Sequence, residues 1–269
     1  ATDSSTAKEA AQGAFQAPND VRVAMVVEQM WQPVPGGSGT YITNLAHSLR
    51  AQGVKVAGIA ARRSHNDPGS SAVGLETMPV RYANLPRQAL YESWNRLHSP
   101  LAEAILPASD LVHATTWAIP PTRKPLVVTV HDLAFLRNPE HFTKRGNSYF
   151  RKSLQRTIKE AQAVIVPSQA TADDCYEAGI DSERVHVIPH GVSVQEVTAS
   201  QIDLFRTAYG LSRPYVLWTG TREPRKNLPG LLHAFSRIAG EFPQLDLVLV
   251  GPSGWGDDAV ERQLIQAIG

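Results

Sequence analysis

Short apolar runs alternate along the chain with longer stretches in which apolar residues recur at helical spacing. The first run, Val21–Val27, is valine-rich and bounded by polar residues, which is typical of a buried parallel strand. Tyr41–Gln52 then repeats apolar residues every three or four positions, and Gly53 ends it. This alternation predicts right-handed βαβ units, and therefore an α/β fold with a parallel sheet covered on both faces.

The same pattern continues to residue 193, and it predicts one complete Rossmann-like, doubly wound domain over residues 21–193. Further strands are expected at Val54–Ala60, Asp110–Ala114, Leu126–His131, Ala163–Pro167 and Val185–Pro189. Helices are expected at Arg87–Leu106 (broken near Pro100), Phe142–Ala161 and Ser168–Ala178, and a polar loop at 62–77. Residues 1–20 are Ala-, Ser- and Gln-rich and predict a disordered or weakly packed arm.

A second domain begins after a connector, residues 194–213, that carries one short helix. Residues 214–269 predict only two strands, Tyr215–Thr219 and Leu245–Val250, with a helix at Leu228–Gly240 and another from Asp257 to Gly269. Two parallel strands leave unpaired edges and bury little apolar surface. We therefore expect this partial domain to be completed by a continuation of the chain or by another chain.

Composition excludes several classes of protein but does not indicate a particular function. Of the 269 residues, 42% are hydrophobic and 19% charged, which is typical of a globular protein and excludes disordered and collagen-like chains. The net charge of +1 argues against nucleic acid as a partner. The single cysteine, Cys175, excludes an intrachain disulfide and a thiolate zinc cluster. No apolar run approaches the roughly 20 residues of a transmembrane helix, so we expect a cytoplasmic protein.

Ligands of open α/β sheets bind at the carboxyl ends of the strands, so the loops there are the candidate sites. Pro33–Gly39 follows the first strand, and its Gly36 and Gly37, with Ser38 and Tyr41 behind them, lead into a helix. Glycines and a helix N-terminus both favour phosphate. The loop matches neither the dinucleotide fingerprint nor the P-loop, and a plain turn explains it equally well.

Histidines follow several strands. His131 and Asp132 come directly after a predicted strand, where the imidazole would face a ligand and a nearby carboxylate would set its charge. His113 ends another strand, and His190 lies in the segment that closes the first domain. A structural role at a strand end is the alternative for each of these histidines.

A basic segment, TGTREPRKN, follows the first strand of the second domain. Adjacent cations at a helix start oppose the helix dipole, so Arg225 and Lys226 make sense if an anion binds there beside Thr221. A diphosphate suits this pair, with Arg as a fork and Lys as a point charge. A solvated basic turn is the alternative.

These segments, in this order, resemble the retaining GT-B glycosyltransferases of the GT4 type. The resemblance covers residues 21–256 through GGSGTYITNLAHSL, DLVHATT, VVTVHDLAFLRNPEHF, AVIVPSQAT, VHVIPHGV, YVLWTGTREPRKNLPGLLHAF and LVLVGPSGWG. It implies a GT-B-like fold, truncated within its C-terminal domain, and a nucleotide-sugar donor held between two Rossmann-like domains. The TGT-x-EPRKN and GPSGWG segments resemble the subgroup that transfers mannose from GDP-mannose.

The resemblance also implies roles for single residues. Gly36 and Gly37 would approach the donor phosphate or the acceptor, His131 would lie beside the transferred sugar, and Arg225 and Lys226 would neutralise the departing diphosphate. Retention would need no protein nucleophile, and no metal or other cofactor is expected. Thr221 stands where many relatives have arginine, and the glutamate pair that holds the donor in relatives would lie beyond Gly269.

Residues 137–160 carry seven cations against two anions. In relatives with lipid-linked acceptors such helices dock on anionic membranes, and a solvated helix face is the alternative. Two other functions compete with sugar transfer. A non-catalytic fragment or sugar-nucleotide-binding module fits the partial second domain. A nicotinamide oxidoreductase fits poorly, because Arg62 and Arg63 stand where an acidic residue should end the second strand.

Overall fold

A computed structural model describes residues 20–32, 34–63, 74–76, 78–192, 194, 196–253 and 259–268. The chain divides into two compact units, one of residues 1–139 and 143–190 and one of residues 140–142 and 191–269. The expected N-terminal arm lies outside the described residues except for Asp20, as does most of the expected loop at 62–77.

Unit 1 is built on a seven-stranded parallel sheet, which confirms the predicted α/β class. The strands are β1 (Arg22–Val26), β2 (Lys55–Ala60), β3 (Val80–Tyr82), β4 (Leu111–Ala114), β5 (Leu126–Thr129), β6 (Ala163–Val166) and β7 (Val185–Val187). Their order is β3-β2-β1-β4-β5-β6-β7, so the direction of winding reverses between β1 and β4. In such sheets, that reversal is where ligands bind.

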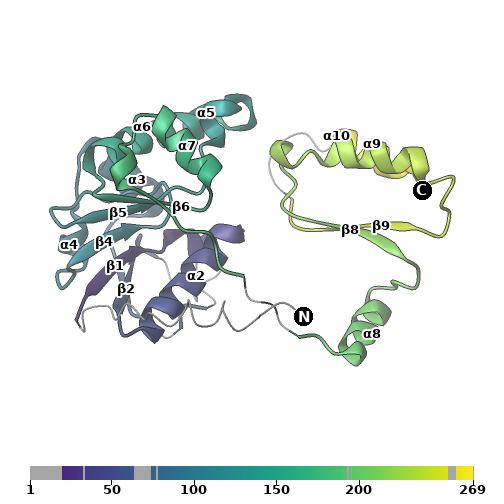
Figure 1. The fold of residues 1–269 in the computed structure, drawn as a ribbon, viewed down its shortest axis with the longest axis horizontal. Helices are drawn as coiled ribbons and strands as arrows, with labels where there is room; N and C mark the ends of the chain where they lie inside the picture. Colours follow the sequence, from purple (N-terminus) through teal and green to yellow (C-terminus); the bar gives the residue numbers. More distant parts are fainter. Residues whose placement is uncertain are drawn as a thin grey trace, which may run out of the picture. The chain divides into compact units, whose positions relative to one another are not determined.

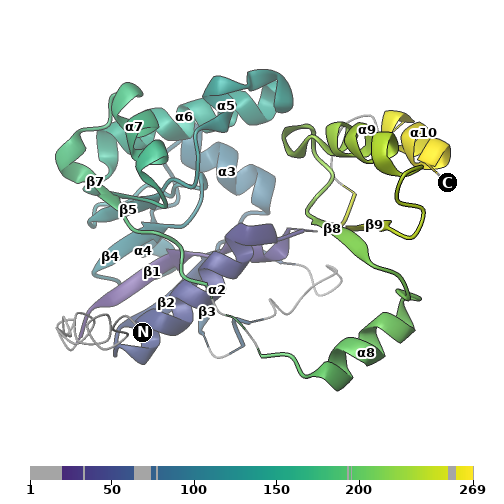
Figure 2. The ribbon, with the colours of Figure 1, turned by 45° about the vertical axis from the view of Figure 1, so that its right-hand side comes forward.

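Helices cover both faces of this sheet, with α2 on one side and α6 and α7 on the other (Figures 1 and 2). The helices are α2 (Gly36–Ala51), α3 (Arg87–Arg96), α4 (Ala102–Ile105), α5 (Ala134–Arg137), α6 (Lys144–Glu160) and α7 (Gln169–Glu177), with short 3₁₀ turns at Glu28–Trp31, Pro139–His141 and Ser182–Arg184. Val26, Val128 and Val164 of three central strands are at most 1% exposed, as the valine-rich runs predict for strands buried on both faces.

The break expected near Pro100 is confirmed, because α3 and α4 lie on either side of a proline that cannot continue a helix. Two other elements differ from the sequence-based expectation. Strand β3 was not predicted, since its three residues contain one aliphatic side chain, Val80. The expected loop ends earlier than predicted, because Gly36–Gly39 already form the first turn of α2.

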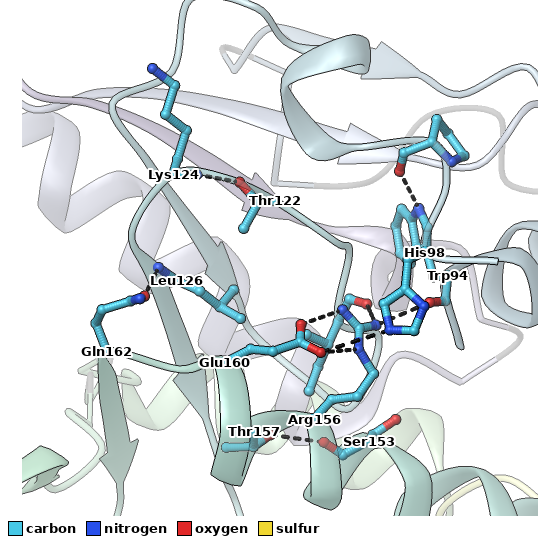
Figure 3. A network of polar contacts seen from close by, with 12 residues as sticks. Trp94, His98, Thr122, Lys124, Leu126, Ser153, Arg156, Thr157, Glu160 and Gln162 are labelled. Carbon is cyan, nitrogen blue, oxygen red and sulfur yellow. Dashed lines mark hydrogen bonds and ion pairs between the residues drawn. The ribbon is translucent and has the colours of Figure 1, made fainter. Parts of the chain in front are cut away.

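A buried arginine ties α6 to α3, as Figure 3 shows. Arg156 donates to the carbonyl oxygens of Trp94, at 3.3 Å, and Ile119, at 2.6 Å. Its guanidinium also pairs with Glu160 one turn later, through contacts of 3.0 and 2.7 Å. Arg156 is buried and Glu160 half-buried, so removing Glu160 would leave a buried charge without its partner, and the network fixes the packing of the two helices.

Unit 2 has two parallel strands and three helices among its described residues. They are α8 (Ala199–Ala208), β8 (Tyr215–Thr219), α9 (Leu228–Ile238), β9 (Asp246–Val250) and α10 (Ala259–Ile268), with a 3₁₀ turn at Pro224–Lys226. Helix α8 is the short helix expected in the connector. Helices α9 and α10 lie together on one side of the two strands (Figure 1). Val216, Leu217 and Val250 remain 41–53% exposed, as expected for so small a sheet.

Candidate functional site

Four residues singled out in the sequence meet at the carboxyl ends of β4 and β5. His131 follows β5, and its Nε2 lies 3.0 Å from the backbone oxygen of Thr115. A carbonyl oxygen only accepts hydrogen bonds, so Nε2 carries the proton of the neutral imidazole. Its Nδ1 lies 3.3 Å from Nε2 of His190 and accepts from it. Both nitrogens of His131 are therefore used within unit 1.

Tyr41 of α2 and His113 of β4 join this cluster through Thr129. The Tyr41 hydroxyl lies 2.9 Å, and Nε2 of His113 lies 2.8 Å, from the Thr129 hydroxyl. The Tyr41 ring packs against the rings of His131 and His190, with centroids 5.0 and 4.9 Å apart. Sequence reasoning missed Thr129, although a hydroxyl within the apolar run LVVTV was a usable signal.

Burial keeps three side chains of the cluster, those of His113, His131 and Tyr41, uncharged at neutral pH. Burial lowers the pKa of His113 to about 4 and also lowers the pKa of His131, against the opposing effect of the Thr115 carbonyl. Burial raises the pKa of Tyr41, whose hydroxyl stays protonated. A ligand here would meet hydrogen-bonding groups rather than a fixed charge. Asp132 opposes this lowering only weakly, and its Oδ1 accepts a hydrogen bond from the Ala134 N–H at 3.0 Å.

The low pKa of His113 predicts acid sensitivity. Between pH 6.5 and about 4 the unfolded chain binds a proton on this imidazole and the folded chain does not. Stability is therefore full above pH 6.5 and is lost as the pH falls through this window, by about 3 kcal/mol at 1.36 kcal/mol per unit. Denaturant unfolding at pH 7 and pH 4 measures it. His113→Gln should remove this dependence, while exposed His47→Gln should keep it; equal slopes in both would contradict the assignment.

The glycines of α2 leave its first turn open. Gly36 has φ of +61°, which favours glycine, and a Cβ at Gly36 or Gly37 would meet nothing within 4 Å. Gly39 is different, because its Cβ would lie 2.5 Å from Cβ of Pro35. Ser38 sits within this helical turn rather than in a loop. The predicted phosphate-binding segment is therefore the N-terminus of α2, which begins at Gly36.

Sequence reasoning did not single out Glu28, a buried carboxylate in the turn beside this helix. Glu28 follows β1, is 1% exposed and accepts from the Ala61 N–H at 2.7 Å. It also pairs with Arg63, whose guanidinium lies 4.9 Å above the Trp31 ring. Burial raises the pKa of Glu28 despite these partners. The sequence around Glu28 matches no motif, which explains the omission.

In unit 2, two glycine loops pack against each other at the ends of β8 and β9. Gly220 and Gly251 have φ of +155° and +151°, and the Gly220 N–H donates to the Val250 oxygen at 3.0 Å. A Cβ at Gly251 would lie 1.8 Å from the Gly220 oxygen. The backbones of the two loops can come this close only because both residues are glycines. Thr221 directly follows Gly220 at this point.

The cation pair that follows is arranged differently from expectation. Arg225 and Lys226 lie in the 3₁₀ turn before α9, while Asn227 caps the helix with its side chain. The two cations therefore directly precede the helix rather than forming its first turn. Arg225 pairs with Glu223 at 2.8 Å, and no carboxylate in the described ranges pairs with Lys226. The Lys226 side chain lies close to Gly220: a Cβ added at Gly220 would be 3.9 Å from Cε of Lys226.

The sequence family model for glycosyltransferase family 4 matches residues 35–196, more than half of the chain. This chain belongs to glycosyltransferase family 4. In the described residues of this family 4 chain, no group of three or more His, Cys, Asp or Glu side chains could hold a metal ion. No helix in those residues is long and apolar enough to cross a membrane.

Curated relatives of this family 4 chain include a mannosyltransferase and a sugar-phosphate synthase. It is 27% identical over 186 residues to O-antigen chain mannosyltransferase B of Escherichia coli, covering 66% of this chain and 49% of the relative. It is 29% identical over 252 residues to alpha-maltose-1-phosphate synthase of Mycolicibacterium smegmatis, covering 85% and 60%. The chain thus spans about half to three fifths of these relatives.

Solved structures show the same fold, which is that of the GT-B glycosyltransferases. The Anabaena protein HepE, solved with UDP and glucose, has a TM-score of 0.66 and 23% identity, over 92% of this chain and 65% of HepE. Sucrose-phosphate synthase of Thermosynechococcus elongatus has a TM-score of 0.61 and 19% identity, over 92% and 67%. The predicted family and fold are therefore confirmed.

Proposed function

We propose that the full-length protein is a glycosyltransferase that moves a sugar from a nucleotide-sugar donor to an acceptor with retention of configuration. One observation carries the proposal: the paired glycine loops after β8 and β9 are followed by a lysine, Lys226, with no carboxylate partner in the described ranges. A close backbone approach beside a free cation suits a diphosphate. The family, and the UDP bound by HepE, support this choice of ligand.

Each site residue has a place in the proposed reaction. Lys226 and Arg225 would neutralise the charge that develops as the diphosphate leaves, and the Thr221 hydroxyl would donate a hydrogen bond to it. The bond between the sugar anomeric carbon and the phosphate oxygen breaks, and the acceptor oxygen bonds to that carbon from the same face. The acceptor proton passes to the departing phosphate oxygen. Neutral His131 would orient the sugar by exchanging its longer contact, the one to His190 at 3.3 Å, for a sugar hydroxyl, without acting as nucleophile.

Finer assignments belong to the same proposal. Mannose from GDP-mannose is the favoured donor, because curated relatives such as the Escherichia coli enzyme are mannosyltransferases. The reaction is proposed to need no metal or other cofactor. The acceptor is unknown, and the basic segment 137–160 is proposed to contact an anionic membrane from the cytoplasmic side.

Donor binding by the full-length protein tests the proposal. Lys226→Ala should weaken binding of GDP-mannose or UDP-glucose about 10- to 100-fold in calorimetry, because one charge-assisted contact of about 1.5–3 kcal/mol is lost. Lys124→Ala removes a lysine from the loop before β5 and is the matched control. Transfer should persist in EDTA. Absence of binding and of transfer with either donor would refute the proposal.

A second candidate concerns the 269-residue chain alone, which we propose as a sugar-nucleotide-binding module without turnover. The observation that favours it is the exposure of Val216 and Leu217 on β8, in a sheet of two strands among the described residues. Calorimetry and transfer assays on this chain beside the full-length protein separate the two candidates. Binding without turnover supports the module, and turnover by the chain alone excludes it.

A further inference from the structure

A cavity lies between α3 and α6 of unit 1. It has a volume of about 370 Å³. Its walls include Glu92, Asn95 and Arg96 of α3 and Arg145, Tyr149 and Lys152 of α6, and we call it the α3–α6 pocket. None of these six residues belongs to the His131 cluster or to the loops after β8 and β9. Three of them lie in the segment 137–160, for which the proposed function names only a membrane contact and no pocket.

Contacts between α3 and α6 hold the walls of the α3–α6 pocket in place. Arg156, one turn beyond Lys152, ties α6 to the Trp94 carbonyl of α3, next to Asn95 (Figure 3). Tyr149 stacks on Tyr91 of α3, with ring centroids 5.6 Å apart and an angle of 21°. These contacts fix the spacing of the two helices, so the cavity is part of the packed structure rather than a gap between mobile elements.

Polar groups of the pocket lack partners. Both polar atoms of the Asn95 amide are buried and make no hydrogen bond to any described residue. The Tyr149 hydroxyl lies near Ser153 without hydrogen-bond geometry, and burial raises its pKa, so it remains a donor. Buried polar groups left unpaired cost about 1–3 kcal/mol each. Their presence beside a cavity therefore indicates that a polar guest completes their hydrogen bonds.

The charge of the pocket selects the guest. Arg96, Arg145 and Lys152 supply three positive charges, and Glu92 supplies one negative charge. Glu92 holds both guanidinium groups, since its carboxylate lies 2.9 Å from Nε of Arg96 and 3.4 Å from Nη2 of Arg145. Lys152 pairs with no carboxylate in the described part of the chain. The excess of positive charge, with neutral donors behind it, suits an anion with several acceptor oxygens.

We propose that the α3–α6 pocket binds a phosphate ester, with Arg96, Arg145 and Lys152 around the phosphate oxygens and the Asn95 amide and Tyr149 hydroxyl as donors. The ester is a soluble phosphate or a phospholipid headgroup, which share this chemistry. The site is separate from the donor site, so it adds a second ligand to the molecule whatever that donor is.

Two probes test the proposal on the full chain and distinguish the sources. Glycerol 3-phosphate is titrated by calorimetry, and phosphatidylglycerol vesicles are compared with phosphatidylcholine vesicles by co-sedimentation. We expect wild type to bind at least one probe. Binding should fall at least 10-fold in Lys152→Gln, whose exposed side chain can change without unfolding, and in Asn95→Leu, which keeps the volume and removes the amide.

Matched controls separate this site from the rest of the surface. Lys124→Gln removes an exposed charge outside both the pocket and the segment 137–160, and it should bind as wild type does. Lys226→Ala should also keep the binding, which separates this proposal from the donor site. The proposal is overturned if wild type binds neither probe, if Lys152→Gln binds as tightly as wild type, or if only Lys226→Ala loses binding.

Discussion

His131→Ala in the full-length protein is expected to lower kcat for sugar transfer about 10²- to 10³-fold, the usual cost of one preorganised hydrogen-bonding group at a reacting centre. The imidazole is held by the Thr115 carbonyl at 3.0 Å and by His190 at 3.3 Å, so its position and tautomer are set before a ligand arrives. Initial rates at saturating donor measure the loss, and KM should change little if donor binding depends on unit 2.

Two variants make this experiment decisive. His131→Gln keeps a hydrogen-bonding group at the site and should recover part of the rate, and His47→Ala removes an exposed histidine from α2 as a control. Thermal unfolding verifies that each variant is folded, since Ala also removes the packing of the Tyr41 ring against His131, with centroids 5.0 Å apart. Normal turnover by a folded His131→Ala would remove His131 from the mechanism.

Gly251→Ala is expected to destabilise unit 2 by about 3 kcal/mol or more, as severe overpacking and backbone strain do. The added Cβ would lie 1.8 Å from the Gly220 oxygen, and that neighbour is backbone that cannot rotate away. The φ of +151° adds strain of its own for any residue with a side chain. The loops must therefore separate, and β8 and β9 should lose protection in hydrogen exchange.

Gly240→Ala is the matched control, because a Cβ at Gly240 would meet nothing within 4 Å. Hydrogen exchange of the β8 and β9 peptides, read beside the β5 peptide of unit 1, localises the effect in the full-length protein. Equal protection in Gly251→Ala and Gly240→Ala would show that the two loops do not need their close approach. Weakened nucleotide binding in Gly251→Ala alone would link that approach to the proposed donor site.

Local signals were strong enough to predict the positions of most elements. Apolar runs such as Leu126–Val130 and the helical period of Tyr41–Gln52 reflect burial, which acts within a single segment. The short β3 was missed, because three residues with one aliphatic side chain carry no period. The extra turn of α2 was missed, because Gly36–Gly39 have the composition of a loop although they form the first turn of the helix.

The sequence by itself determined the parallel α/β fold, the resemblance to family 4 and the candidate residues at the strand ends, because periodicity and ordered motifs are properties of neighbouring positions. Only the tertiary structure decided which residues meet. His131 and His190 are 59 positions apart and lie 3.3 Å from each other, and Arg145 reaches Glu92 across 53 positions. Such contacts, the pKa values lowered by burial and the unpaired amide of Asn95 depend on how helices and strands pack, which no local pattern contains.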